Sequence, residues 1–128
     1  MAGGTVPKIQ RFEDLQAWQK ARQLTQVIDE LALSAKFVRD DYLRNQIRRA
    51  AGSVMHNIAE GFDSGSGPEF IRFLKMSRHS ASEVQSELYQ ALDRKHITEE
   101  ERQRAYDLAR EAKRLINGLI AYLRKRKS

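Results

Sequence analysis

The 128-residue chain contains no cysteine, two prolines and seven glycines. Without cysteine it can form neither a disulfide framework nor a thiolate metal site, and this composition suits a reducing compartment. Most of the prolines and glycines, which interrupt helices, lie in residues 3–7 and 61–68. The rest of the chain is therefore open to long, uninterrupted helices.

Long hydrophobic runs are also missing from the chain. No apolar stretch approaches the roughly 20 residues that a membrane-spanning helix needs, and the first residues do not form a hydrophobic signal region. The length is that of one domain with one core. We therefore expect a cytoplasmic protein without a membrane partner, with a flexible N-terminal segment over residues 1–11, a helical bundle over 12–124 and a basic C-terminal tail over 125–128.

The positive charge is unevenly distributed along the sequence. Lysine and arginine together number 23 against 17 acidic residues, which gives a formal net charge of +6. The surplus lies in residues 42–61 and 98–128, while the remaining segments are balanced. Segregated positive charge is typical of proteins that bind a polyanion. A solvated surface that only keeps the chain soluble is the alternative interpretation.

Apolar residues recur every three or four positions in four long segments, which is the period of an amphipathic helix. The first segment runs from about residue 14 to 33, and a short polar crossing follows it. The other three segments follow in turn and end near residues 61, 95 and 124. Four such helices with short connections predict an all-α fold, an antiparallel up-down-up-down four-helix bundle.

Several residues mark the ends of these helices. Asp40 or Asp41 is suited to cap the start of the second helix, and Gly61 is suited to a left-handed position at its end. Pro68 fits the first position of the third helix, where its missing N–H costs nothing. The fourth helix begins with a capping-box pattern in which Glu101 follows Thr98 by three residues.

The second helix carries no formal charge from residue 50 to residue 59. A helix on the surface of a monomer normally hides one stripe and exposes charge on its back, so an uncharged circumference indicates burial on more than one side. In a chain this short, the second covering is expected to be another copy of the same protein. Met55 and Ala59 are the predicted oligomer-interface residues.

Helical projection places polar residues along facing flanks of the second and third helices. If these helices are antiparallel neighbours, the polar residues would form a hydrogen-bonded seam that fixes their register. The predicted members of this structural polar seam are Ser53, Asn57, Glu60, Ser80, Glu83 and Glu87. A carboxylate metal site is the alternative, but the chain contains no Glu-x-x-His motif, and His79 points away from the seam. We therefore predict no metal and no cofactor.

Catalytic motifs are missing as well. The three histidines, His56, His79 and His96, have no evident nucleophile or acid partner, and the chain has no thiol. The glycines near residue 65 have neither the lysine nor the spacing of a phosphate-binding loop. The sequence therefore predicts a protein that is not an enzyme and has no catalytic residues.

Clustered basic residues provide the candidate nucleic-acid contacts. Arginine forks match phosphate oxygens, and such contacts hold a backbone without reading its bases. The candidate residues are Arg44, Arg48, Arg49, Arg110, Lys113, Arg114, Arg124, Lys125, Arg126 and Lys127. The alternative is that Arg110 and Lys113 pair with Asp107 and Glu111 on their own helix.

Several segments resemble a known family, the four-helix-bundle proteins encoded in intervening sequences of 23S ribosomal RNA genes. The resemblance extends from about residue 12 to 123 and rests on FEDLQAW (12–18), QIRRAA (46–51) with Ser53, NIAEG (57–61), EFIRFL (69–74) and SASEV (80–84). His79 stands where the family often has glycine. The resemblance implies a homopentameric ring without an assigned enzymatic activity. It also implies kinship with accessory proteins of diversity-generating retroelements, which associate with a reverse transcriptase and with template RNA.

The sequence thus predicts a homo-oligomer, pentameric according to the resemblance, that binds RNA or an RNA–protein complex through its cations. Two alternatives remain open. One is an accessory subunit of a retroelement reverse transcriptase, and the other is a scaffold that contacts only protein.

Overall fold

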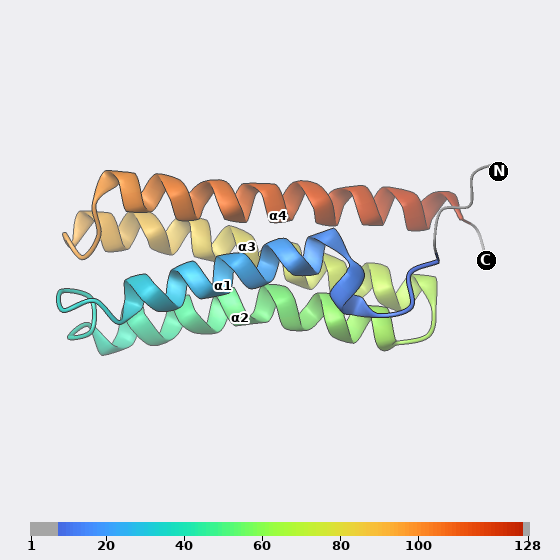
Figure 1. Ribbon diagram of the computed structural model, residues 1–128, viewed down its shortest axis with the longest axis horizontal. Helices are drawn as coiled ribbons and strands as arrows, with labels where there is room; N and C mark the ends of the chain where they lie inside the picture. Colours follow the sequence, from blue (N-terminus) through green and yellow to red (C-terminus); the bar gives the residue numbers. More distant parts are fainter. Residues whose placement is uncertain (1–7, 127–128) are drawn as a thin grey trace.

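The structure is a computed structural model that describes residues 8–126. It contains a short 3-10 helix, η1 (Phe12–Asp14), and four long helices, α1 (Gln16–Ala32), α2 (Asp41–Asp63), α3 (Gly67–Asp93) and α4 (Glu99–Lys125). Each long helix runs antiparallel to the one before it (Figure 1). The predicted all-α, up-down-up-down four-helix bundle is confirmed. The predicted N-terminal segment and basic tail lie partly outside the described residues, which run from 8 to 126.

The helices pack in their order along the chain. Helix α2 contacts α1 and α3, helix α4 contacts α3, and α4 closes the bundle against α1. Helices α2 and α4 therefore lie at opposite corners of the bundle. Because each is antiparallel to α3, they run in the same direction (Figure 1). Among the described helices, none is long and apolar enough to cross a membrane.

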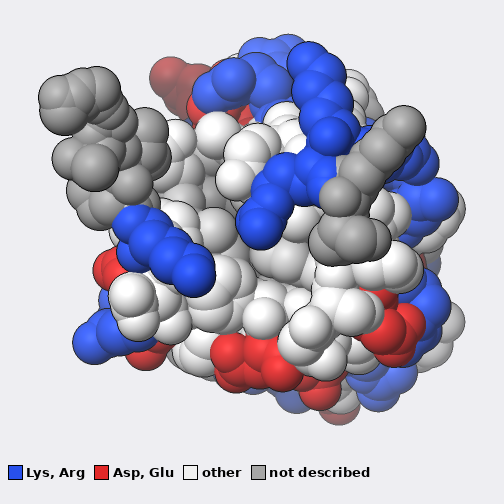
Figure 2. All heavy atoms as spheres, turned by 90° about the vertical axis from the view of Figure 1, so that its right-hand side faces the viewer, with Lys and Arg blue, Asp and Glu red and all other residues white. Residues whose placement is uncertain are grey.

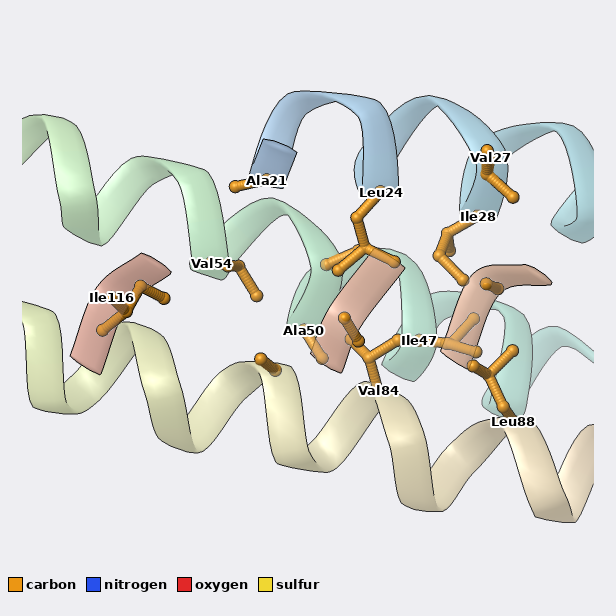
Figure 3. Packing of buried hydrophobic residues seen from close by; sticks show 14 of the residues in the cluster. Ala21, Leu24, Val27, Ile28, Ile47, Ala50, Val54, Val84, Leu88 and Ile116 are labelled. Carbon is orange, nitrogen blue, oxygen red and sulfur yellow. The ribbon is translucent and has the colours of Figure 1, made fainter. Parts of the chain in front are cut away.

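The core is a continuous stripe of aliphatic side chains from all four helices (Figure 3). Its fully buried members include Leu24, Ile28, Ile47, Val54, Val84, Leu88 and Ile116. Burying such side chains is the main favourable contribution to folding, at roughly 25 cal/mol per Å² of apolar surface. Tyr122 does not join this core, because it lies on the outer side of α4 and its side chain is 56% exposed.

Two of the helix-end predictions are confirmed by hydrogen bonds. Asp40 caps α2 by accepting from the Leu43 N–H at 3.2 Å. Thr98 and Glu101 form the capping box at the start of α4, with bonds of 2.9 and 3.1 Å. Pro68 lies in the first turn of α3, one position later than expected, because the helix begins at Gly67.

The expected role of Gly61 is wrong. Helix α2 continues through it to Asp63, and among the glycines of residues 8–126 it is Gly65 that has a positive φ. A Cβ atom on Gly61 would lie 2.7 Å from Cβ of Phe73 and 2.9 Å from Cδ1 of Phe70. Gly61 therefore allows α3 to approach α2 closely and does not end the helix.

Two further boundaries differ from expectation. Helix α3 ends at Asp93, two residues before the expected end, because Lys95 has a positive φ of 64°. The crossing between α1 and α2, expected to be polar, contains Phe37, which is 1% exposed. Its ring stacks on His96 with centroids 5.0 Å apart. The crossing therefore closes one end of the core.

Candidate nucleic-acid and assembly surfaces

Two of the three candidate arginines on α2 are occupied by partners within the chain. Nη1 of Arg44 donates to the Val38 carbonyl at 2.6 Å, and its Nη2 lies 3.2 Å from the Asp41 carboxylate. Nε of Arg48 donates to Asp29 at 3.1 Å, which links α2 to α1. Arg49 is exposed, and no acidic group of the described residues lies within ion-pair distance of it.

The candidate cations in the middle of α4 are also engaged. Arg110 donates to Asp107 at 2.7 Å, and Nε of Arg114 donates to Glu111 at 2.9 Å. Lys113 donates at 3.0 Å to the side-chain oxygen of Gln85 on α3. The alternative prediction, pairing along the helix, therefore holds for Arg110, whereas the side chain of Lys113 contacts the neighbouring helix α3. Such exposed pairs contribute little stability but neutralise the surface locally.

The last turn of α4 is different. Arg124, Lys125 and Arg126 are exposed, and within residues 8–126 none of them lies within 4 Å of a carboxylate. Arg126 lies over the ring of Tyr122, 5.8 Å from its centroid. In Figure 2, lysine and arginine gather over the end of α4, while acidic side chains lie mostly lower, where α2 ends and α3 begins. Lys127, the last candidate, lies outside the described residues.

Three of the six expected seam residues meet between α2 and α3. Ser80 Oγ donates to Ser53 Oγ at 2.9 Å, and the Asn57 amide donates to the Ser53 carbonyl and to its hydroxyl, both at 2.9 Å. The sequence interpretation missed a fourth polar contact, in which the fully buried Ser77 donates to the Val54 carbonyl at 2.6 Å. In the sequence, Ser77 shows only that it shares the spacing of the apolar residues of the third helix, and this spacing does not indicate a hydrogen-bond partner.

The three seam carboxylates are not part of this hydrogen-bonded group. Glu60 and Glu83 are exposed, while Glu87 is half-buried. Burial, together with the charge of Glu83, raises the pKa of Glu87 to about 7. Its buried Oε1 atom has no hydrogen-bond partner among the described residues. No group of three or more histidine, aspartate or glutamate side chains in this part of the chain could hold a metal ion.

The outer side of α2 is uncharged at its centre. His56 is exposed, whereas Met55, Ala59 and Gly52 are partly exposed. A Cβ atom on Gly52 would lie 3.8 Å from the His56 ring, an ordinary contact. The predicted interface residues Met55 and Ala59 therefore retain surface that a second molecule could cover.

A shallow groove lies between α1 and α4. Its volume is about 430 Å³, and its lining residues are Gln23, Gln26, Val27, Glu30, Arg104, Asp107 and Leu108. This lining has no hydroxyl, imidazole or thiol group, and its ionisable groups are the carboxylates of Glu30 and Asp107 and the guanidinium of Arg104.

A solved structure has a similar fold. It is described as a protein with unknown function from the S23 ribosomal protein family of Bacteroides thetaiotaomicron. The two share 20% sequence identity and a TM-score of 0.73, over 82% of this chain and 95% of the other. This likeness supports the four-helix architecture alone. No curated protein sequence matches the chain.

The sequence itself matches a family model over most of its length. The matched residues, 13–118, include all of α1, α2 and α3 and most of α4. The matching model describes the 23S rRNA-intervening sequence protein, and the chain therefore belongs to that family.

Proposed function

We propose that this protein is a non-enzymatic homo-oligomer that binds RNA, alone or in a ribonucleoprotein, through the end of α4. One observation carries the proposal: Arg124, Lys125 and Arg126 lie together without acidic partners among the described residues, whereas Arg44, Arg48 and most of the other candidates are engaged within the chain. Unpaired cations gain the most from a phosphate backbone, because they lose no internal partner when they bind it.

The nature of this surface indicates how RNA would bind. Guanidinium groups donate paired hydrogen bonds to phosphate oxygens and hold the backbone without reading sequence. One molecule offers only a small cluster, but an oligomer repeats the cluster, and linked weak sites bind much more tightly than one site. Self-association and RNA binding therefore support each other in this proposal. A reducing cytoplasm suits a chain without cysteine.

A salt series of RNA binding with matched variants tests the proposal. The double variant Arg124→Gln/Arg126→Gln removes two unpaired cations, and Arg110→Gln/Arg114→Gln removes two paired ones. For single-stranded RNA we expect the first variant to reduce the slope of log affinity against log salt by about 0.7 for each lost phosphate contact. The second variant should change the slope much less. Equal losses in both variants, or no RNA binding by the wild type at low salt, would refute the proposal.

Oligomer size has its own measurement. The pentamer proposal predicts a light-scattering mass of about five times the 14.8 kDa protomer. A protein that assembles but binds no RNA at low salt would instead be a protein-only scaffold. A partnership with a retroelement reverse transcriptase is the narrower form of the proposal, and joint purification of the two proteins in an RNA-dependent manner is its test.

A further inference from the structure

Helix α4 has an uncharged stretch like that of α2. Residues 115–123 carry no formal charge, yet Asn117, Gly118, Ala121 and Tyr122 are exposed. We define the α4 face as Gly118, Ala121 and Tyr122, and the α2 face as Gly52, His56 and Ala59. All six residues are exposed or partly exposed, and the two helices that carry them lie at opposite corners of the bundle. One protomer therefore carries two separate uncharged faces that its own fold leaves open.

The glycine at the start of each face has no evident role inside the protomer. A Cβ atom on Gly118 would meet no atom within 4 Å, and one on Gly52 would make only an ordinary contact with His56. Gly61 is different, because the packing of α3 leaves no room for a side chain there. Glycine inside a helix destabilises it relative to alanine. A close approach from outside the protomer would account for glycine at both exposed positions.

Hydrogen bonds through α3 place the two faces at the same level of the bundle. Ser80 donates to Ser53 on α2, and Arg78 donates to Asn117 on α4 at 2.8 Å. Ser80 and Arg78 lie within one turn of α3, and Ser53 and Asn117 are the sequence neighbours of the two glycines. Gly52 and Gly118 are therefore level with each other, on helices that run in the same direction (Figure 1).

We propose that the α4 face of one protomer packs on the α2 face of a second copy of this chain, with the two helices parallel. This inference rests on the self-association in the proposed function and specifies its interface. With Gly52 placed opposite Gly118, the residues that follow have complementary charge. Glu60 at the end of the α2 face then lies within a turn of Lys125, which follows Gly118 by two helical turns. Arg124 and Arg126 flank Lys125, and Arg126 lies over the ring of Tyr122, a member of the α4 face.

The arrangement of the faces also sets the symmetry. Two different surfaces in contact make a head-to-tail interface, which continues until it closes into a ring or grows into a filament. Because both faces lie at the same level, successive protomers stay side by side with little shift along the bundle axis, and the assembly closes into a ring where each contact also turns the next protomer. A symmetric contact of α2 with α2 would leave the α4 face of every protomer uncovered.

Cysteine cross-linking tests this interface, because the wild-type chain contains no cysteine. The variants are His56→Cys on the α2 face and Ala121→Cys on the α4 face, joined by mild oxidation or a short bis-maleimide. We expect neither single variant to cross-link with itself, a co-refolded mixture of the two to give only dimers, and the double variant to give a ladder of covalent multimers. Ser82→Cys on the exposed side of α3, combined with Ala121→Cys, is the matched control and should stay uncross-linked.

A second measurement does not depend on cross-linking geometry. Gly118→Leu adds a side chain into open space in the protomer, so its helical circular dichroism should be unchanged while its mass in light scattering falls to that of one chain. Ser82→Leu adds the same side chain elsewhere and should leave the wild-type mass unchanged.

Three results would overturn the inference. Dimers of His56→Cys alone would show a symmetric α2 contact. A double variant without cross-links, in a protein whose wild type is multimeric, would refute the interface and leave self-association standing. A monomeric wild type would refute both. RNA binding is measured in the salt series, so a protein that binds no RNA would refute the proposed RNA function and leave the test of this interface unaffected.

Discussion

The Asp40 carboxylate lies 2.8 Å from Nε2 of His96, although 56 positions separate the two residues in the sequence. The same oxygen accepts from Nη1 of Arg94 at 2.7 Å, while the other carboxylate oxygen caps α2. Asp40 therefore ties the start of α2 to the connection between α3 and α4. The hydrogen bonds from His96 and Arg94 lower the pKa of Asp40 to about 2.

The lowered pKa makes Asp40 a source of acid sensitivity. A carboxyl whose pKa is lower in the folded state stabilises the fold above its unfolded pKa of about 3.9, and this contribution is lost as the pH falls towards 2. Asp40→Asn keeps a capping group but removes the charge. We expect the free energy of unfolding of the wild type to fall more steeply than that of the variant between pH 4 and 2, measured by urea denaturation. Asp63→Asn is the exposed control, and parallel profiles for Asp40→Asn and the wild type would contradict the assignment.

Glu87 has the opposite pH dependence. Its pKa is raised to about 7, so the folded state holds a proton that the unfolded chain releases near pH 4.5. The fold is therefore destabilised as the pH rises from about 4.5 to 7. Glu87→Gln should stabilise the protein at pH 8, by about 1 kcal/mol once solvent screening of a half-exposed group is considered, and should have little effect at pH 4. An equal effect at both pH values would exclude titration of Glu87 as the cause.

Gly61 and Gly118 form a matched pair for testing close packing. Gly61→Ala places a methyl group against Phe70 and Phe73 and should destabilise the fold by about 1–3 kcal/mol, the usual cost of overpacking. Gly118→Ala meets open space and should stabilise the protomer by about 0.5–1 kcal/mol through helix propensity. Thermal melts at a concentration where the chain is monomeric measure both changes. A neutral Gly61→Ala variant would show that α3 shifts easily away from α2.

Arg102 is held between two aromatic rings at the start of α4. Its guanidinium lies 4.8 Å from the ring centroid of Tyr89 and 5.4 Å from that of Tyr106, and it donates two hydrogen bonds to Glu99. A lysine would keep the charge but lose the planar fork and the stacking. Arg102→Lys should therefore lower the melting temperature more than Arg104→Lys, an exposed change two residues away. Equal melting temperatures would show that stacking adds nothing beyond charge.

The sequence could predict the features that depend on local spacing. The capping box of Thr98 and Glu101 and the turn at Pro68 require only residues within a few positions of each other. The burial of Phe37 and the contact of Asp40 with His96 join distant segments, so periodicity could not reveal them. Gly61 was misplaced because glycine near a helix end has the same local signal whether it ends the helix or admits a neighbour.

The same difference between local and distant contacts applies to the candidate cations. The pairing of Arg110 with Asp107 three residues earlier was visible as an alternative in the sequence, whereas the pairing of Arg48 with Asp29 joins two helices and was not. The cations left without partners in the described part of the chain could be identified only after these pairs were known. Residues 115–123 carry the same uncharged signal as residues 50–59, but the structure was needed to show that their outer side is open.

The sequential packing of the helices also affects how the chain folds. Helices α1 and α2, α2 and α3, and α3 and α4 each form a hairpin of adjacent segments. Of the contacts between the four long helices, that of α1 with α4 joins helices that are not consecutive in the sequence. Contacts between nearby segments cost little loop-closure entropy and favour rapid folding. During synthesis the first three helices can therefore pack before α4 is complete, and the last helix then seals the open side of the growing bundle.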